Sequence, residues 1–279
     1  MQSYYEEFKK SVKLRLTDNC AIPLSGGLDS TLIVKSINDM NLIKSCTFIC
    51  MNPDSYAREV AKKYNLNVHY FYPNIEDFES YLHEIVSIWE EPFYSISVGY
   101  FLYKEINKLG LRVSLSGLGS DELYGGYSYY NTIKYPRGLF KEIVAINNEE
   151  KLSNDKNLLI NHHLRKNDKM GLEFNVEGRY PFLDKNLMKF NENCFNKKII
   201  KEILLNDFDE PFINRKKTGF SMDWVDNDII EKNVKELFNK IGYINIENKR
   251  QRMFYAQLNI WLKIFNNDNE LNCDSFFNI

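Results

Sequence analysis

The stretch Ala21-Ile22-Pro23-Leu24-Ser25-Gly26-Gly27-Leu28-Asp29-Ser30 is the part of this chain from which its fold can be inferred. A short apolar run leads into a turn that two glycines permit, and helix-forming residues follow at once, so the pattern predicts a strand–loop–helix junction. Such a loop would direct the backbone N–H groups of Gly26 and Gly27, and the hydroxyls of Ser25 and Ser30, at one point. That point lies at a helix N-terminus, where unpaired donors and the helix dipole favour an anion.

A carboxylate such as that of Asp29 is not expected in a loop that binds only phosphate, which is also negatively charged. Its presence is explained if Asp29 binds a Mg²⁺ ion that bridges the phosphates. The alternative is a Ser/Gly turn that caps an ordinary helix. The full Ser-Gly-Gly-Leu-Asp-Ser sequence after an apolar strand resembles the pyrophosphate loop (PP-loop) of the ATP pyrophosphatases, which cut ATP between the α and β phosphates. It is not a Walker loop, because no Gly-Lys-Ser/Thr follows. The resemblance implies ATP binding.

The composition indicates a globular protein of one large domain or two small ones. The chain has 279 residues, of which 44% are hydrophobic and 27% charged, and its net charge of −2 offers no basic surface for nucleic acid. No apolar run approaches the roughly 20 residues of a membrane span, and the first residues lack the pattern of a signal peptide. The 5 cysteines form no Cys-x-x-Cys pair and suit reduced thiols. We therefore expect a cytoplasmic protein that binds neither nucleic acid nor membranes.

Apolar spacing predicts alternating helices and strands in the first half of the chain. The expected helices cover 3–16, 28–37, 56–64, 78–89 and 98–109, and the expected strands 21–24, 45–51, 68–72 and 111–115. This alternation predicts an α/β fold with a doubly wound parallel sheet, in which ligands bind beyond the carboxyl ends of the strands. The strand signal disappears after about residue 130. We therefore expect an α/β core over 1–135 and a helical part over 136–279 that completes the substrate site.

A second glycine loop follows the fourth expected strand, in the run Ser114-Leu-Ser-Gly-Leu-Gly-Ser-Asp-Glu-Leu-Tyr-Gly-Gly-Tyr127. Ser116 would lie at the carboxyl edge of the sheet, as Ser25 would. Asp121 in this run is a second carboxylate that would face the first loop. Together with Asp29 it would complete an oxygen cage for Mg²⁺ and offset phosphate charge.

The two loops together resemble the synthetase domain of asparagine synthetase and its relatives, the β-lactam and carbapenam synthetases. Three further stretches support this resemblance. Trp89–Phe93 is similar to the acidic-Pro-Phe turn of the family, Asp168–Asp184 to its helical-domain signature, and Arg215–Phe220 to its basic Gly-Phe loop. The matching motifs occur in order from about residue 5 to residue 265.

The resemblance implies a nucleotide alpha hydrolase-like fold and a two-step reaction that forms an amide. ATP would lie between the two loops, and a substrate carboxylate would attack its α phosphate to give an acyl-adenylate and pyrophosphate. An amine or ammonia would then displace AMP. The resemblance assigns Mg²⁺ to Asp29 and Asp121. It assigns the nucleotide to Leu24, Ser25, Gly26, Gly27, Asp29, Ser30, Cys50, Ser116, Gly117, Lys216 and Lys217.

Two further residues receive catalytic roles from the resemblance. The family has a lysine that stabilises the adenylate on a helix beginning Lys-x-x-Leu, which Lys201 matches best, with Lys198 as the alternative. Either could instead be a surface lysine, and Lys216 and Lys217 could be solvated rather than bound to pyrophosphate. Glu177 would face the substrate, or would pair with Arg179.

Two departures from the family pattern bear on the second half-reaction. The chain reaches the first loop at residue 25, and Gln2 stands where glutamine-using enzymes have their nucleophilic cysteine. We therefore expect no glutaminase domain, and nitrogen from ammonia, an amine substrate or a separate glutaminase. Leu118 stands where the family has Glu or Tyr, and leucine cannot accept a proton. Adenylation could survive while the amine chemistry is lost, altered, or supplied by Glu177 or Glu91.

The expected function is that of an ATP-dependent, amide-forming ligase (a carbon–nitrogen ligase of the asparagine synthetase type) that releases AMP and pyrophosphate. One alternative is a nucleotide-binding subunit that does not catalyse and acts through a partner. It predicts ATP binding without AMP formation. Another alternative is a tRNA-modifying ATP pyrophosphatase, whose usual basic domain and thiol-bearing motifs are not seen in the sequence.

Overall fold

A computed structural model describes residues 1–73, 77–132, 134–135, 143–144, 147–193, 195–215 and 225–266. The chain forms two compact units, each assembled from several segments. The larger unit comprises the described residues of 1–73, 101–135 and 143–220, and the smaller unit those of 74–100 and 221–279. The sequence predicts instead two consecutive parts that meet at residue 135, beside residues outside the described ranges, and that division stays a prediction.

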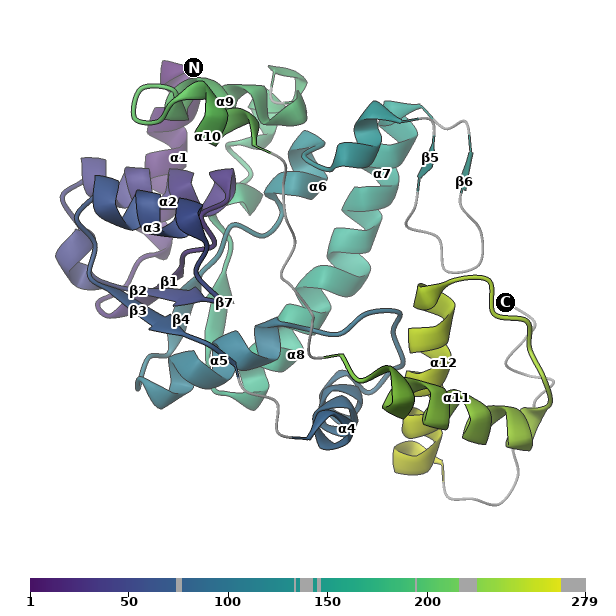
Figure 1. The fold of residues 1–279 in the computed structure, drawn as a ribbon. Helices are drawn as coiled ribbons and strands as arrows, with labels where there is room; N and C mark the ends of the chain where they lie inside the picture. Colours follow the sequence, from purple (N-terminus) through teal and green to yellow (C-terminus); the bar gives the residue numbers. More distant parts are fainter. Residues whose placement is uncertain are drawn as a thin grey trace. The chain divides into compact units, whose positions relative to one another are not determined.

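The larger unit is built on a parallel sheet of 5 strands in the order β3-β2-β1-β4-β7 (Figure 1). These strands are β1 (Cys20–Pro23), β2 (Cys46–Met51), β3 (Val68–Phe71), β4 (Val113–Leu115) and β7 (Glu177–Arg179). The chain moves outward from β1 to β3, returns to the other side of β1 with β4, and continues to β7. The strand order thus reverses between β1 and β4, which is the switch point where parallel α/β sheets bind ligands. The predicted doubly wound α/β fold is confirmed.

Helices cover both faces of this sheet (Figure 1). On one face lie α1 (Gln2–Arg15), α2 (Leu28–Asp39), α3 (Ser55–Lys63), α9 (Lys198–Leu204) and α10 (Glu210–Asn214). On the other lie α8 (Arg165–Glu173) and α5 (Gly99–Lys108), of which the first two residues belong to the smaller unit. Two further helices, α6 (Ser120–Tyr124) and α7 (Asn148–Leu158), follow β4, and a π-helical segment (Leu159–Leu164) joins α7 to α8.

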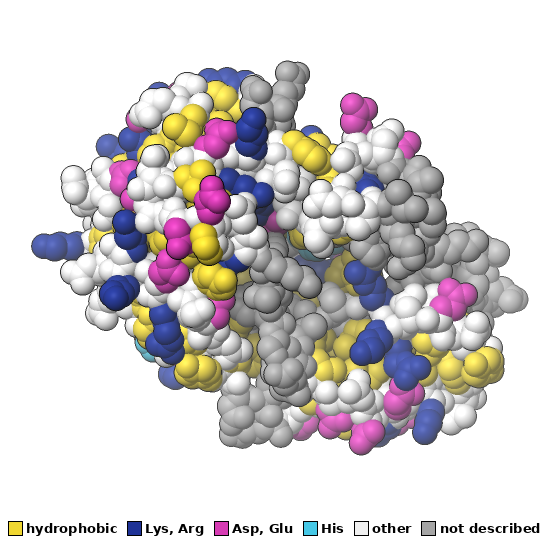
Figure 2. All heavy atoms as spheres, turned by 45° about the horizontal axis from the view of Figure 1, so that its top comes forward, with side chains coloured by type: hydrophobic (Ala, Val, Ile, Leu, Met, Phe, Trp, Pro, Cys, Tyr) yellow, Lys and Arg dark blue, Asp and Glu magenta, His cyan; other side chains and the backbone are white. Residues whose placement is uncertain are grey.

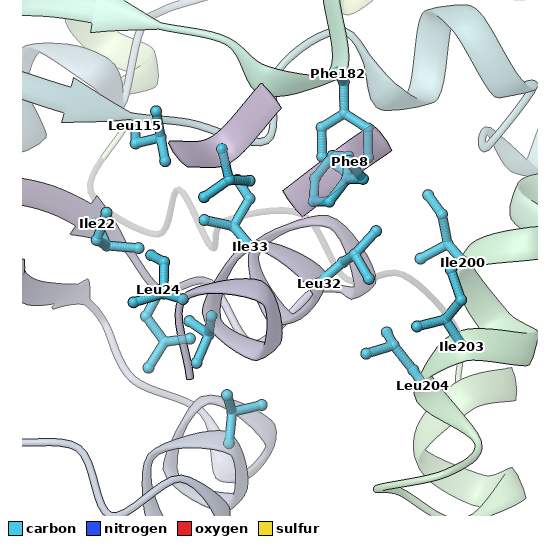
Figure 3. Close-up of a cluster of buried hydrophobic side chains, with 14 of the residues drawn as sticks. Phe8, Ile22, Leu24, Leu32, Ile33, Leu115, Phe182, Ile200, Ile203 and Leu204 are labelled. Atoms are coloured by element: carbon cyan, nitrogen blue, oxygen red, sulfur yellow. The ribbon is translucent and has the colours of Figure 1, made fainter. Parts of the chain in front are cut away.

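Helix α2 is central to the hydrophobic core of the larger unit (Figure 3). Residues 30–37 of this helix are all buried, because one side of α2 faces the sheet and another faces α9. Ile33 points toward Leu24 and Leu115 of the sheet layer, whereas Leu32 lies on the side of Phe8 and Ile200 (Figure 3). Burial of a Leu or Ile side chain contributes about 1.5 to 3 kcal/mol. The core therefore fixes α2, and with it the loop at its N-terminus, against β1, β4 and α9.

Strand β7 corrects the expectation that no strand follows residue 130. Its three residues, Glu-Gly-Arg, pair in parallel with Val113–Leu115 at the edge of the sheet. Two charged residues around a glycine carry no apolar run or alternation, so periodicity gives no signal for a strand here. A small antiparallel pair, β5 (Lys134–Tyr135) with β6 (Ile143–Val144), also lies in this part of the chain.

The smaller unit is helical in the residues that are described. It contains α4 (Phe78–Trp89), α11 (Asn227–Ile241) and α12 (Lys249–Phe265), and α12 packs on both of the others. The buried Gln257 of α12 accepts a hydrogen bond from the Phe93 N–H at 2.9 Å and donates to the Ser95 carbonyl at 2.8 Å. The acidic-Pro-Phe turn after α4 is therefore fixed by α12.

The visible face in Figure 2 carries Lys and Arg side chains interspersed with Asp and Glu, as the near-neutral net charge implies. Across the described ranges, every helix is too short or too polar to cross a membrane.

Candidate active site

The first loop forms a rigid junction between β1 and α2. Gly26 has φ +69°, in the left-handed region that glycine tolerates, and a Cβ there would lie 2.5 Å from the Ala57 nitrogen of α3. The Ser25 hydroxyl accepts a hydrogen bond from the Gly27 N–H at 3.2 Å and lies 3.1 Å from the Ser30 hydroxyl. Ser30 in turn donates to the Gly27 carbonyl at 3.0 Å. These bonds fix the loop in a conformation in which Ser25 stays exposed.

The second loop begins at the carboxyl end of β4 and meets the first. Gly117 lies so near to Asp29 that a Cβ on the glycine would be 2.8 Å from the Asp29 Cβ. Ser120, at the start of α6, donates from its hydroxyl to Asp29 Oδ1 at 2.7 Å. This hydrogen bond joins two residues that are 91 positions apart in the sequence. The two loops can lie this close because Gly117 has no side chain. The structure therefore brings Ser25, Asp29 and the Ser116–Gly117 loop together at the switch point, where the sequence predicts them.

One lysine, Lys197, joins the carboxylates of the two loops. Its Nζ lies 2.6 Å from Asp29 Oδ2, 2.8 Å from Asp29 Oδ1 and 2.6 Å from Asp121 Oδ1. The Lys197 side chain is 7% exposed, so the three charges form a largely buried group, here called the acid–lysine site. Burial alone would lower the pKa of Lys197, but the charges of Asp29 and Asp121 outweigh burial and raise it. At neutral pH this lysine is therefore an ammonium.

Lys197 is a site residue that no sequence motif indicates. It precedes α9 directly and has φ +55°, as does its neighbour Asn196, a left-handed backbone that is uncommon outside glycine. The long stem of Lys197 passes over Gly126, where any Cβ would collide with Lys197 Cε and Asp121 Oδ1. The two adjacent lysines, Lys197 and Lys198, directly before an apolar helix are a feature of the sequence that could have drawn attention to this position. Helical spacing, however, cannot predict where the side chain of a residue with a left-handed backbone points.

The other lysines with predicted roles lie elsewhere or outside the described residues. Lys201 is one turn after Lys197 on α9 and is half-buried; burial and the nearby Lys197 charge lower its pKa. Lys198 is exposed. Lys216 and Lys217 fall outside the described residues. The role of Lys201 in stabilising an adenylate stays a prediction.

Glu177 lies on β7 and pairs with Arg179, the second of the two alternatives that the sequence left open. The Arg179 Nε and Nη2 atoms donate to the two Glu177 oxygens at 2.9 and 3.0 Å, and this pairing lowers the pKa of Glu177. Both residues line a pocket of about 420 Å³ with Leu14, Arg15 and Tyr180. None of these residues belongs to the acid–lysine site, and a catalytic role for Glu177 stays a prediction.

Leu24 and Cys50, which the resemblance assigns to the adenine, lie at the carboxyl ends of β1 and β2. The Leu24 N–H donates to the Ile49 carbonyl at 2.8 Å. Both side chains belong to the hydrophobic core and are at most 2% exposed, and burial raises the pKa of the Cys50 thiol to about 12. Cys50 is therefore an apolar core residue at neutral pH rather than a reactive thiolate.

The donors at the acid–lysine site are suited to magnesium. Within the described ranges, no group of three or more His, Cys, Asp and Glu side chains could hold a metal on its own. Magnesium is commonly bound by one or two carboxylates together with phosphate oxygens and water. Two carboxylates that already share one cation, as Asp29 and Asp121 share the Lys197 ammonium, fit this arrangement.

The fold defines an α/β protein in which two glycine loops meet at the switch point of a parallel sheet. The family model described as Asparagine synthase matches residues 3–156 and 147–260. The chain belongs to the asparagine synthase family.

Curated relatives are similar over about two thirds of this chain. The asparagine synthetase (glutamine-hydrolyzing) of Zea mays is 31% identical over 202 residues, which are 66% of this chain and 33% of that protein. Asparagine synthetase (glutamine-hydrolyzing) 3 of Arabidopsis thaliana is 33% identical over 198 residues, 64% of this chain and 32% of that protein. The chain thus spans about a third of the length of these relatives.

Among solved structures, an NH3-dependent NAD synthetase from Campylobacter jejuni is 16% identical, with coverage of 79% of this chain and 96% of that chain. Its TM-score of 0.28 is too low for this likeness to carry a conclusion.

Proposed function

We propose that this chain is an ATP-dependent amide-forming ligase that activates a substrate carboxylate as an acyl-adenylate. The products would be AMP, pyrophosphate and an amide. Membership of the asparagine synthase family supports this proposal, and so do the names of the relatives.

The observation that carries the proposal is the meeting of Asp29 and Asp121 at one buried cation, beside the N-terminus of α2. Asp29 is in the first turn of this helix, and Gly27 is its N-cap. The N-terminus of α2 supplies unpaired N–H groups and a positive dipole end for a phosphate. Oxygen ligands for a divalent cation lie directly beside it. A magnesium-bound nucleotide needs both features at one place.

In the first half-reaction, a carboxylate oxygen of the substrate would attack the α phosphorus of ATP. The bond between that phosphorus and the bridging oxygen of the β phosphate breaks, and pyrophosphate leaves. A bound Mg²⁺ would neutralise phosphate charge, held by Asp29 and Asp121. The protein would contribute mainly by holding the two reactants in line and by offsetting charge, for which the Lys197 ammonium is placed.

In the second half-reaction, the nitrogen of ammonia or an amine would attack the acyl carbon. AMP then leaves with one of the former carboxylate oxygens, and the nitrogen loses a proton. Lys201 is our candidate for stabilising the adenylate, and Glu177 for receiving the proton. A glutamate of ordinary pKa is a carboxylate at neutral pH, and the hydrogen bonds from Arg179 lower the pKa of Glu177 further. It is therefore in the correct state to accept a proton, although as a weakened base.

The substrates in this proposal are a small-molecule or peptide carboxylate and an ammonia or amine donor. The relatives are named as glutamine-hydrolyzing enzymes, and this chain matches about a third of their length. Nitrogen would reach this part of the protein as ammonia, from a glutaminase activity or from solution, or as an amine substrate.

The test is an assay for AMP and pyrophosphate with Mg-ATP, a panel of carboxylic acids beginning with aspartate, and ammonia as the amine. We expect both products in equal amounts with the correct acid, and no ADP. Saturable ATP binding without AMP formation for any acid would favour a non-catalytic subunit. Co-purified RNA, with AMP formed only in its presence, would favour tRNA modification.

Two variants assign the reaction to the site. Asp29→Asn and Asp121→Asn should each lower pyrophosphate release by about 100- to 1,000-fold, the usual loss when one charge-stabilising group is removed from an active site. Asp39→Asn, at the other end of α2, is the matched control and should change the rate less than about threefold. Full activity in both site variants would contradict the assignment of magnesium to these carboxylates.

A further inference from the structure

We propose that Arg215 is an anion-binding residue of the first loop, which contacts the phosphate or pyrophosphate part of the nucleotide. This inference rests on the proposed function and adds a residue to the site. Neither the loop motif nor the pairing of Asp29 with Asp121 predicts it.

Arg215 follows α10 directly and reaches the first loop from the side of α3. Its guanidinium lies 4.0 Å from the ring centre of Tyr56 and 4.7 Å from that of Phe212, so two aromatic rings fix its position. Its Nη2 donates to the backbone carbonyl of Gly26. The guanidinium is thus held against the loop whose N–H groups we assign to phosphate.

The charge of Arg215 is only partly balanced by carboxylates of the described residues. Among the described residues, no Asp or Glu forms an ion pair with Arg215, and its Nη1 is buried without a hydrogen-bond partner. Asp54 and Glu59 contribute favourable charge at longer range, and the Asp54 carboxylate caps α3 by accepting from the Ala57 N–H at 2.7 Å. Burial outweighs that charge and lowers the pKa of Arg215.

A guanidinium whose Nη1 is buried without a hydrogen-bond partner is costly to retain, because the desolvation of that atom is not repaid by a partner. Such a group fits a site that is completed by an anionic ligand. The planar fork of arginine matches phosphate oxygens, and hydrogen bonds between ionised groups are about twice as strong as neutral ones. The ligand chemistry that fits both the guanidinium and the adjacent Gly26–Gly27 loop is a phosphate or pyrophosphate anion.

The experiment is calorimetric titration of the protein with magnesium pyrophosphate and, separately, with Mg-ATP. For Arg215→Gln we expect affinity for pyrophosphate to fall about 10- to 100-fold, as for the loss of a charged hydrogen bond. The pyrophosphate affinity of Arg215→Lys should lie between those of Arg215→Gln and the unmodified protein. Lysine keeps the positive charge but lacks the planar guanidinium that can donate two parallel hydrogen bonds. The matched control is Arg58→Gln, since Arg58 also lies over a tyrosine ring, that of Tyr70, at 4.9 Å, but is exposed. It should bind as the unmodified protein does.

Thermal unfolding without ligand separates a binding role from a structural one. If Arg215 serves the ligand, Arg215→Gln should be about as stable as the unmodified protein, because the loss of the contacts with Tyr56, Phe212 and Gly26 is offset by removing a buried Nη1 atom that has no hydrogen-bond partner. Lower stability with unchanged pyrophosphate affinity would mean a structural role and would overturn the inference. Equal binding by the variant and the unmodified protein would overturn it as well, and would leave the proposed ligase activity standing. If the unmodified protein bound neither pyrophosphate nor Mg-ATP, both proposals would fall.

Discussion

Two groups of the same composition, one lysine between two aspartates, lie at opposite ends of α2. At the N-terminal end is the acid–lysine site of Asp29, Asp121 and Lys197. At the C-terminal end Lys35 Nζ lies 3.1 Å from Asp39 Oδ2 and 2.6 Å from Asp207 Oδ2, a group here called the Lys35 cluster. Each group has one lysine and two aspartates, so composition alone does not tell which of the two binds a ligand.

The two groups differ in what else they bind. In the Lys35 cluster, Tyr5 donates to Asp39 Oδ2 at 2.9 Å and Tyr64 to Asp207 Oδ2 at 3.1 Å. These hydroxyls bring α1 and the C-cap of α3 to the cluster, which therefore connects several elements on one face of the sheet. The acid–lysine site instead lies where two loops meet at the carboxyl edge of the sheet.

The dipole of α2 adds to this difference. Asp29 in the first turn is stabilised by the positive end of the helix, which would also attract an anionic ligand. Asp39, the last residue of α2, lies at the negative end, so it depends on Lys35 and Tyr5 for its ionised form. The same charges thus serve stability at one end of the helix and, in our proposal, nucleotide binding at the other.

The strongest test of this comparison replaces the lysine in each group. Lys35→Met and Lys197→Met each leave two aspartates without their shared cation, and we expect each to lower the free energy of unfolding by about 2 to 3 kcal/mol. This is below the 3 to 5 kcal/mol for fully buried pairs, because both sites keep some exposure. Added Mg²⁺ should restore the melting temperature of Lys197→Met by several degrees, since the cation can take the place between the two carboxylates. It should not restore Lys35→Met, because Tyr5 and Tyr64 donate to the same Asp39 and Asp207 oxygens that face Lys35. At the acid–lysine site, Ser120 donates to Asp29 Oδ1, and Oδ2 faces the cation.

Thermal unfolding of both variants with and without Mg²⁺, followed by circular dichroism, measures this difference. The unmodified protein in Ca²⁺ and in Na⁺ of equal ionic strength controls for screening by salt. An equal response of the two variants to Mg²⁺ would mean that the acid–lysine site is as purely structural as the Lys35 cluster.

A smaller effect should follow from a change that moves one loop without altering any charge. In Gly117→Ala the new methyl group would lie 2.8 Å from the Asp29 Cβ, closer than such atoms approach, so the two loops must separate. We expect the rate of AMP formation to fall about 10- to 100-fold, since small displacements of reacting groups cost this much. The melting temperature should change by only a few degrees, because the Lys35 cluster and the core are not touched. Gly110→Ala is the control for a loss of stability without crowding between the loops, because no atom lies within 4 Å of the Cβ position there but the φ of +75° strains any side chain. It should leave the rate unchanged. An unchanged rate in Gly117→Ala would show that the contact between the loops is not required for the reaction.

The sheet and the two loops could be predicted from the sequence because their signals are local. An apolar run followed by glycines marks the end of β1, and a similar pattern marks the end of β4. The position of Asp29 beside Asp121 then follows from the rule that ligand loops lie at the carboxyl ends of parallel strands.

Lys197, Arg215 and strand β7 could not be predicted in this way. Lys197 depends on a left-handed backbone at two successive residues, which helical spacing cannot indicate. Arg215 depends on Tyr56 and Gly26, more than 150 residues earlier in the chain, through contacts that only the fold creates. Strand β7 exists because β4 offers an edge for Glu177–Arg179, not because these residues favour a strand.

The smallest expected difference between the two groups appears in acid. Burial raises the pKa of Asp39, but hydrogen bonds from Tyr5 and Lys35 outweigh burial, and the net result is a lowered pKa. A carboxyl group with a lower pKa in the folded state adds stability above its unfolded pKa of about 3.9. That stability is lost as the pH falls through the lower folded value.

Replacing Asp39 by asparagine should therefore flatten the acid limb of stability below about pH 4, by less than about 1 kcal/mol because the pair is partly exposed. Urea unfolding between pH 2.5 and 6 measures it. Asp77→Asn, which removes an exposed carboxylate whose pKa is also lowered, by hydrogen bonds within its own helix cap, should flatten the acid limb as well and gives the size of the effect for a cap outside the cluster. If Asp39→Asn lost stability in acid as steeply as the unmodified protein, the Lys35 cluster would not stabilise the ionised form of Asp39. Its contrast with the acid–lysine site would then rest on geometry alone.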